Sequence, residues 1–271
     1  MSGIIVNRDT CTKCGVCQSA CLMGLIEISE DGFPESSPRF KLCSECGACI
    51  TMCPTGSLEN INIPREQIQT IDLSMSVNNE QISQFLKIRR SVRAYKGMPV
   101  KREDIITAID TARYAPTGCN AQEVKWLVID NQEKLKSIGK IGSEFMITAM
   151  KTLPNFADTV GLFENRKQSG YDIFLHSAPA LVATYAEEST MSIALYDCTI
   201  ALSYFDLAAN SLGMGCCWLG FFPKAANEYP PIRELVELPK GYVIHACMAV
   251  GYPKYQHYRI PSRNLSDIIW H

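Results

Sequence analysis

Eight of the thirteen cysteines lie within the first 53 of the 271 residues, in two runs of identical spacing, C-x2-C-x2-C-x3-C. The two runs are Cys11, Cys14, Cys17, Cys21 and Cys43, Cys46, Cys49, Cys53. A spacing of two residues places neighbouring thiolates on a tight loop whose sulfurs converge, and the fourth ligand comes from a short helical turn. The pattern therefore predicts two cubic iron–sulfur clusters of the 4Fe-4S type, built on an internal repeat.

Two other uses of these cysteines compete with the clusters. A disulfide framework suits a small secreted domain, but residues 1–10 lack the features of a secretory signal, and a reducing cytosol disfavours disulfides. Structural zinc uses two C-x2-C pairs separated by a longer spacer, whereas each run here packs four cysteines into eleven residues. The spacing favours clusters over both alternatives and leaves both open.

Gly15 and Gly47 follow the second cysteine of each run, and Pro54 follows Cys53. With these residues the segment resembles a bacterial 2x(4Fe-4S) ferredoxin. The resemblance implies crossed ligand sets, in which the fourth cysteine of each run binds the other cluster. One set is then Cys11, Cys14, Cys17 and Cys53, and the other is Cys43, Cys46, Cys49 and Cys21. Leu22 departs from the family, which usually has proline after the fourth cysteine.

A second group of reactive side chains begins at Arg89, where three guanidiniums and a hydroxyl fall within five residues as Arg89, Arg90, Ser91 and Arg93. Such a group can bind a phosphate bidentately and keep a further cation for another anion. A solvated basic face explains the same run equally well. Three later segments change the balance: a turn with two amides at residues 115–122, glycines at 213–220, and a basic tail after Gly251.

In this order, from about residue 80 to 271, these motifs resemble the FMN-dependent nitroreductase family. The resemblance implies that Arg89, Ser91, Arg259 and Arg263 contact the FMN phosphate, and that Arg93 and Asn120 bind the pyrimidine edge of the flavin. It also implies that Leu219 and Gly220 direct backbone N–H groups toward N5 and O4. The full set of implied FMN-binding residues is Arg89, Arg90, Ser91, Arg93, Pro116, Thr117, Asn120, Gln122, Leu219, Gly220, Arg259 and Arg263.

The same resemblance implies a homodimer whose FMN sites lie at the subunit interface. The expected reaction needs no residue as a catalytic nucleophile. Thr117-Gly118 replaces the more usual paired serines, and His257 stands where some relatives carry lysine. These departures concern individual hydrogen bonds and not the cofactor class.

The elements that must position these residues can be read from periodicity and turn signals. We expect a ferredoxin-like domain with linker over residues 1–75 and an FMN-binding domain over 76–271, the stretch 64–79 being linker. Residues 26–40 predict a short strand, a turn and a proline-bearing loop. Helices are expected at 80–88, 103–114 and 189–212, the last capped by Ser189, and strands at 124–129, 180–185, 214–220 and 242–251. This order predicts an α+β fold with a mixed sheet flanked by helices.

Composition excludes several classes of partner. With 26 Lys+Arg against 28 Asp+Glu, the net charge is -2, which argues against a nucleic-acid-binding protein. Uncharged stretches such as residues 212–222 fall short of the roughly 20 apolar residues of a membrane span. We therefore expect no nucleic-acid or membrane partner and a cytoplasmic location.

Together these features predict an oxidoreductase that passes electrons between two 4Fe-4S clusters and FMN to reduce a nitroaromatic, a quinone or an activated alkene. The electron donor is left open between NAD(P)H and a protein. A different class of function also stays open: an electron carrier or redox sensor without small-molecule turnover.

Overall fold

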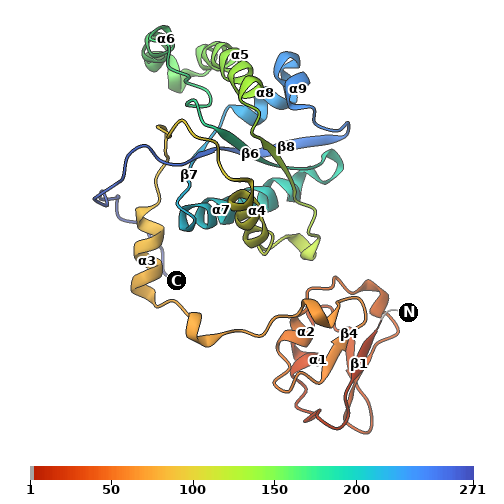
Figure 1. Ribbon diagram of the computed structural model, residues 1–271. Helices are drawn as coiled ribbons and strands as arrows, with labels where there is room; N and C mark the ends of the chain where they lie inside the picture. Colours follow the sequence, from red (N-terminus) through yellow and green to blue (C-terminus); the bar gives the residue numbers. More distant parts are fainter. Residues whose placement is uncertain (1–2) are drawn as a thin grey trace. The chain divides into compact units, whose positions relative to one another are not determined.

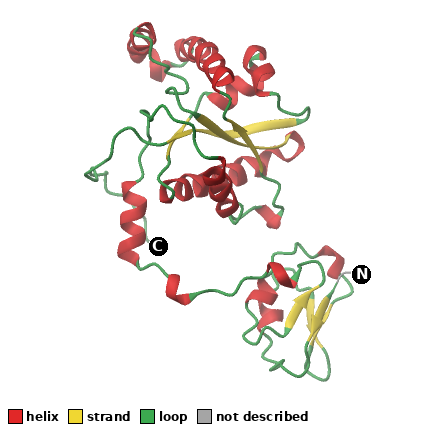
Figure 2. Cartoon of the chain, viewed as in Figure 1, coloured by secondary structure: helices red, strands yellow, loops and turns green. Residues whose placement is uncertain are grey.

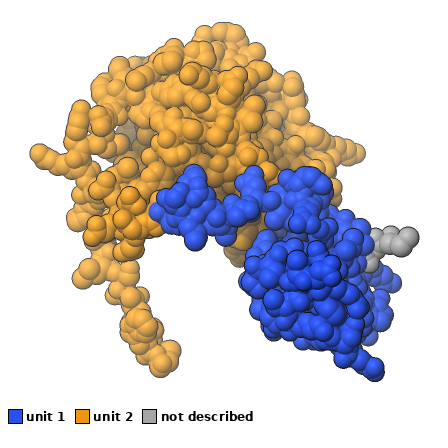
Figure 3. Space-filling model, turned by 60° about the horizontal axis from the view of Figure 1, so that its bottom comes forward, with its two compact units in different colours: residues 1–76, 118–121 blue, residues 77–117, 122–271 orange. Residues whose placement is uncertain are grey.

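The computed structural model describes residues 3–271 and divides into two compact units, which Figure 3 colours separately. Unit 1 comprises residues 1–76 and 118–121, and unit 2 comprises residues 77–117 and 122–271. Residues 1–2, which belong to the stretch 1–10 that lacks the features of a secretory signal, lie outside the described residues. Within residues 3–271, no helix has both the length and the apolar character required to cross a bilayer.

Unit 1 is built from two short antiparallel strand pairs and two short helices (Figure 2). Strand β1 (Ile4–Val6) pairs with β4 (Leu58–Asn60), and β2 (Ile26–Ile28) pairs with β3 (Pro34–Ser36). The second pair corrects the sequence prediction, because a strand stands where a proline-bearing loop was expected. Pro34 is the first residue of β3, a position at which the missing N–H is tolerated.

The helices of unit 1 each begin immediately after a glycine of a cysteine run. Helix α1 (Val16–Ala20) follows Gly15, and α2 (Ala48–Thr51) follows Gly47. The two glycines have φ values of 71° and 74°, in the left-handed region that a side chain disfavours. Each glycine thus turns its loop directly into the helix that carries the third cysteine of the run.

Beyond the cysteine runs, residues 64–78 contain two 3-10 turns, η2 (Arg65–Gln67) and η3 (Leu73–Met75). Helix α3 (Asn79–Ile88) begins at a capping box, in which the Asn78 side chain accepts from the Gln81 backbone and the Gln81 side chain accepts from the Asn78 backbone. Arg89 directly follows this helix.

Unit 2 is centred on a four-stranded sheet in the order β5-β6-β8-β7 (Figure 1). Its strands are β5 (Lys125–Ile129), β6 (Ala180–Glu187), β7 (Gly215–Trp218) and β8 (Tyr242–Gly251). All three pairings of this sheet are antiparallel. The α+β class is confirmed, but the described sheet is antiparallel where a mixed one was predicted, since no parallel neighbours join its four strands.

Helices cover both faces of this sheet (Figure 1). Helices α4 (Arg102–Ala112) and α7 (Met191–Ser211) lie on one face, and α5 (Gln132–Lys151), α8 (Phe222–Glu228) and α9 (Pro230–Val236) lie on the other. Helix α6 (Val160–Gln168) follows the 3-10 turn η5 (Pro154–Thr159) beside α5. Because the sheet is buried on both faces, strand β6 is a nearly continuous apolar run.

Helix α7 is the predicted long helix, with a different start. Ser189 lies in the preceding 3-10 turn η6 (Glu188–Thr190), where its hydroxyl bonds Glu187, so it does not cap α7 as predicted. The face carrying Phe205 is buried, whereas Tyr196 and Tyr204 on the remaining surface are exposed. An apolar helix surface therefore stays uncovered in the single chain.

Candidate functional site

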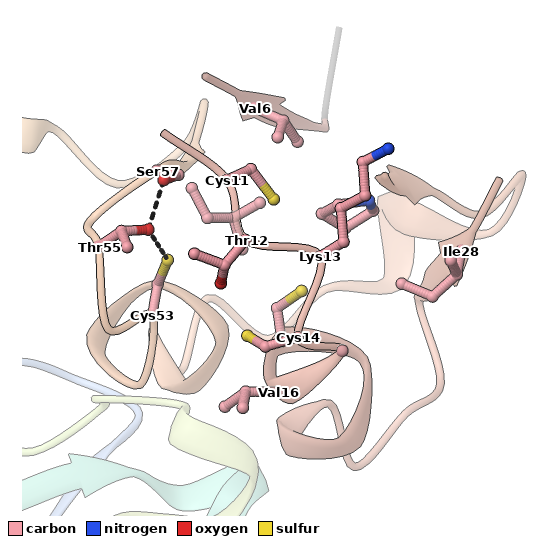
Figure 4. A pocket seen from close by; sticks show the side chains of 14 residues that line it. Val6, Cys11, Thr12, Lys13, Cys14, Val16, Ile28, Cys53, Thr55 and Ser57 are labelled. Atoms are coloured by element: carbon pink, nitrogen blue, oxygen red, sulfur yellow. Dashed lines mark hydrogen bonds between the residues drawn. The ribbon is translucent and has the colours of Figure 1, made fainter. Parts of the chain in front are cut away.

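Four cysteines of unit 1 line one pocket, and they are Cys11, Cys14, Cys17 and Cys53. The remaining walls are largely apolar and include Val6, Val16, Ile28, Pro34 and Leu58. Figure 4 shows the pocket, with the Cys53 sulfur next to the Thr55 hydroxyl and Thr55 next to Ser57. This pocket holds three cysteines of the first run and one of the second, the combination that crossed pairing requires.

The other four cysteines form a second group. Burial, followed by the neighbouring thiols of Cys43, Cys21 and Cys46, raises the pKa of Cys49 to about 11. These three neighbours and Cys49 again combine three cysteines of one run with the fourth cysteine of the other. Burial likewise raises the pKa of Cys17 in the first group, where Cys14 and Cys11 add to the effect.

Hydrogen-bond donors approach the sulfurs of both groups. The backbone N–H of Leu25 donates to Cys21 Sγ at 3.2 Å, and that of Glu45 donates to Cys43 Sγ at 3.4 Å. At Cys53 burial alone would raise the pKa, but hydrogen bonds from the Thr55 side chain and nearby backbone groups lower it overall. All eight cysteines are free thiols. Four cysteines gathered around a largely apolar pocket, with N–H donors directed at several of the eight sulfurs, suit the ligand set of a 4Fe-4S cluster.

In unit 2, two of the arginines predicted to bind the phosphate, Arg89 and Arg263, line one cavity together with Arg90, which was predicted as an FMN-binding residue without a phosphate role. The cavity lies between the end of α3 and the C-terminal tail, and Leu86, Lys87, Ile260, Pro261 and Ser262 complete its lining. Three guanidiniums and an ammonium around one opening suit a phosphate ester. The cationic lining is the observation in unit 2 that fits FMN.

Arg89 is held by an acidic residue that sequence reasoning did not single out. Its Nη1 donates to Asp206 Oδ2 at 3.3 Å, and Asp206 is only 4% exposed in α7. Burial raises the pKa of Asp206, while Arg89 and a hydrogen bond with the Cys216 thiol oppose the rise. A carboxylate beside Arg89 limits how the guanidinium can turn, so Asp206 is a positioning residue for the cavity.

The segment from Ser91 to Tyr95 is tied to the sheet. The N–H of Val92 donates to the Cys216 carbonyl at 2.9 Å, and the Tyr95 hydroxyl donates to the Val92 carbonyl at 2.6 Å. A Cβ on Gly215 would lie 2.5 Å from Val92 Cγ2, so only glycine permits this approach. The strand that follows α7 thus fixes the backbone of the arginine segment.

Arg93 is further positioned by Tyr171 and His176. The Tyr171 hydroxyl donates to the Arg93 carbonyl at 3.0 Å and lies 3.2 Å from His176 Nδ1. Since the hydroxyl's one proton goes to Arg93, it accepts from His176, which is therefore the Nδ1–H tautomer. Burial lowers the pKa of His176 to about 4, so the ring is neutral at pH 7. Ser91 and Arg93 also bond the buried Cys217 thiol.

The structure corrects the role predicted for Leu219. Its backbone N–H donates to the Cys247 carbonyl at 2.9 Å, and its side chain is buried. The donor is used by the continuation of the β7–β8 pairing, so it does not point to a ligand. At Gly220, by contrast, an added Cβ would meet no described atom within 4 Å, and the backbone there faces open space.

The remaining predicted residues lie in two loops. Thr117 Oγ1 accepts from the Gln122 backbone, which closes the turn that begins at Pro116. Asn120 belongs to unit 1, where its amide donates to the Ser44 carbonyl at 2.9 Å. Arg259 is exposed in the tail outside the lining of the three-arginine cavity. For these residues contact with FMN stays a prediction.

Asp206, Tyr171 and His176 were missed as functional residues. Asp206 does carry a signal in the sequence, because it is the one charged residue in the largely apolar run 200–209. A carboxylate buried in such a helix is expected to pair with a cation. Nothing local distinguishes Tyr171 or His176, whose partner Arg93 is far away in the chain.

Comparison with protein families gives two matches. The model of the nitroreductase family matches residues 86–252, and the model of a 4Fe-4S dicluster domain matches residues 10–57. The chain is similar to an Archaeoglobus fulgidus protein assigned as an NADH dehydrogenase/NAD(P)H nitroreductase, with 28% identity over 65% of this chain and 87% of the relative. It is 27% identical to the iodotyrosine deiodinase of Thermotoga neapolitana over 62% of this chain and 86% of that enzyme.

A further relative is the FMN reductase [NAD(P)H] of Bacillus subtilis, with 27% identity over 64% of this chain and 66% of that protein. Among solved structures, an FMN-bound nitroreductase from Desulfitobacterium hafniense has a TM-score of 0.57 at 21% identity, covering 72% of this chain and 99% of its own. An FMN-bound nitroreductase from Bacteroides fragilis has a TM-score of 0.55 at 22% identity, covering 71% and 100%. At these identities the structural likeness shows the fold. The predicted resemblance, enzyme class and cofactor classes are confirmed by these matches together.

Proposed function

The chain belongs to the nitroreductase family, and from that premise we propose that it passes electrons between two 4Fe-4S clusters and FMN to reduce a small organic acceptor. The observation that carries the proposal is that one chain combines two four-cysteine groups with a three-arginine cavity of phosphate-binding character. We assign the cluster domain to residues 1–75 and the flavin domain to residues 76–271.

The two kinds of cofactor have complementary electron counts. When bound, FMN takes up electrons one at a time and releases them in pairs, whereas a 4Fe-4S cluster carries one. A nitro group, a quinone or an activated alkene requires pairs. The fusion of both cofactor domains in one chain supports a relay that converts single electrons into a two-electron reduction.

In the cluster domain we assign Cys11, Cys14, Cys17 and Cys53 to one cluster and Cys43, Cys46, Cys49 and Cys21 to the other. The shared pocket of the first set and the mutual electrostatics of the second support this pairing. Apolar walls around the sulfurs limit the access of water, and the N–H donors stabilise negative charge on them.

In the flavin domain, Arg89, Arg90 and Arg263 hold the phosphate, and Asp206 keeps Arg89 in place. Arg93, whose backbone is fixed by Tyr171, supplies a cation for the pyrimidine edge of the flavin. A fixed cation there favours the negatively charged reduced form. No side chain is needed as a nucleophile, and solvent supplies the protons that accompany the electron pair.

We further propose a homodimer. The exposed apolar side chains of α7, among them Ile193, Tyr196, Ile200 and Tyr204, form a surface that a second copy would cover. A cytoplasmic location belongs to the same proposal, because two clusters bound by eight cysteines and five further cysteines without a disulfide suit a reducing compartment.

The proposal is tested by purifying the protein without oxygen and measuring iron, sulfide and flavin per chain. We expect about eight irons, about eight sulfides and one FMN, and steady-state reduction of at least one acceptor from the three classes. Zinc in place of iron, or iron without flavin, would overturn the proposal. Fast electron exchange with a protein donor but no turnover of any acceptor would instead favour an electron carrier.

A further inference from the structure

The two cysteine runs are offset by 32 positions, from Cys11 to Cys43, so each residue beside one group of cysteines has a counterpart beside the other. Asn60 and Ile28 are such a pair, and each is the last residue of its strand, β4 and β2 respectively. The repeat therefore offers an internal comparison between two equivalent positions with different chemistry.

Asn60 directs a hydrogen-bond donor at a cysteine sulfur. Its side-chain Nδ2 donates to Cys43 Sγ at 3.7 Å, and the residue is only 2% exposed. Its Oδ1 accepts from the backbone N–H of Asn62 at 3.0 Å, which fixes the orientation of the amide. The Asn60 side chain is thus held with its N–H groups toward the sulfur.

The side chain of the counterpart, Ile28, has no hydrogen-bond donor. Its side chain lines the pocket of the first group of cysteines, which includes Cys11, the counterpart of Cys43. One cluster site therefore receives a buried side-chain amide where the equivalent position of the other site is aliphatic.

Reduction adds an electron to a cluster and increases the negative charge on its sulfurs. A buried N–H donor stabilises that charge, and hydrogen bonds to the sulfurs are among the factors that set cluster potentials. We propose that Asn60 selectively raises the reduction potential of the cluster bound by Cys43, Cys46, Cys49 and Cys21. The inference rests on the proposed function, since it requires both clusters in their crossed sites.

Two other residue differences between the repeats could also change the cluster potentials, and each can be separated from the effect of Asn60. Lys13 corresponds to Glu45, and both side chains are exposed, so salt screens their opposite charges. Thr55 corresponds to Met23, and the Thr55 hydroxyl lies 3.7 Å from Cys53 Sγ, in the first cluster site. Thr55 is therefore the matched residue whose loss should affect the other cluster.

The test is an anaerobic redox titration of the full-length protein, followed by EPR. In Asn60→Leu we expect one of the two midpoints to fall, with the oxidised-to-reduced ratio at a fixed potential rising about tenfold, which is about 59 mV for one electron. The second midpoint should not move. Thr55→Val should move the midpoint that Asn60→Leu leaves in place, and the Asn60→Leu shift should persist at high salt.

Asn60→Asp provides the control for folding, because it keeps the acceptor for Asn62 and removes the donor. It should lower the same midpoint at least as far as Asn60→Leu does. Unchanged midpoints in both Asn60 variants, equal shifts of both midpoints, or one midpoint responding to both Asn60 and Thr55 substitutions would overturn the proposal.

A measurement on the unaltered chain tests the proposal even if the variants fail to bind their clusters. Protein labelled with 15N-asparagine should show a nitrogen hyperfine coupling to one reduced cluster, and its absence overturns the proposal. If the parent protein binds fewer than two clusters per chain, the proposed function fails. If it binds two clusters but neither reduction potential depends on Asn60, only the present inference fails.

Discussion

Arg89 and Asp206 are 117 residues apart in the chain and meet at 3.3 Å, the arginine partly exposed at the end of α3 and the aspartate buried in α7. The pair links the helix that leads into the flavin domain to the helix that covers one face of its sheet. It also gives the three-arginine cavity one guanidinium with a fixed position.

Replacing Asp206 by Asn should weaken FMN binding about tenfold, or about 1.4 kcal/mol, because Arg89 loses the charged partner that orients it. The dissociation constant of FMN from the apoprotein measures this. Asp110→Asn removes an exposed partner of Arg113 and should leave the constant unchanged. Tighter FMN binding in Asp206→Asn would show that Asp206 competes with the phosphate for Arg89.

Arg89→Gln should lower the affinity for FMN roughly a hundredfold, since a hydrogen bond between charged groups contributes about 1.5–3 kcal/mol. Riboflavin, which has no phosphate, should bind the variant and the parent equally well. Arg113→Gln, at an arginine that does not line the cavity, is the control for a general loss of charge. Equal losses for the two flavins would place Arg89 away from the phosphate.

Neutral His176 should make the protein less stable in acid. Its pKa is about 4 in the folded chain against 6.5 for the free side chain, so stability present above pH 6.5 is lost as the pH falls toward 4. Between pH 6.5 and 5 this amounts to about 2 kcal/mol. Denaturant unfolding of His176→Gln should lack that part of the pH dependence. A variant with the same acid sensitivity as the parent would contradict the prediction.

Gly215→Ala should destabilise the flavin domain by about 1–3 kcal/mol, because the new methyl group would lie 2.5 Å from Val92 Cγ2 and 2.9 Å from Pro253 Cγ. FMN affinity should fall as well, since the segment with Ser91 and Arg93 must shift. Gly161→Ala in α6, where an added Cβ meets no described atom within 4 Å, is the matched control. It should stabilise the helix by about 0.5–1 kcal/mol. Thermal denaturation distinguishes the two.

Much of the cluster domain could be predicted because its information is local. The spacing of each cysteine run and the glycines at positions 15 and 47 specify loops that turn into helices within a few residues. The long strands and helices of the flavin domain also follow from periodicity, with boundaries within a few residues for β8 and α4.

The predictions were wrong where the outcome depends on distant partners. Whether Leu219 offers its N–H to a ligand depends on the Cys247 carbonyl, which lies on the neighbouring strand. The relative direction of the strands, and hence the antiparallel sheet, depends on connections that span many residues. The contact between Arg89 and Asp206 was not predicted for the same reason, because no local sequence pattern indicates which residues of two separate helices will meet.

We propose that electrons reach FMN through the clusters, and stopped-flow mixing with a reduced protein donor tests this route most directly. Without oxygen, flavin bleaching should be slowed roughly tenfold or more in Cys43→Ser, equivalent to at least about 1.4 kcal/mol on the barrier. Cys198→Ala, a buried cysteine of α7 outside both groups, should bleach at the parent rate. Equal rates in Cys43→Ser and the parent would contradict the relay.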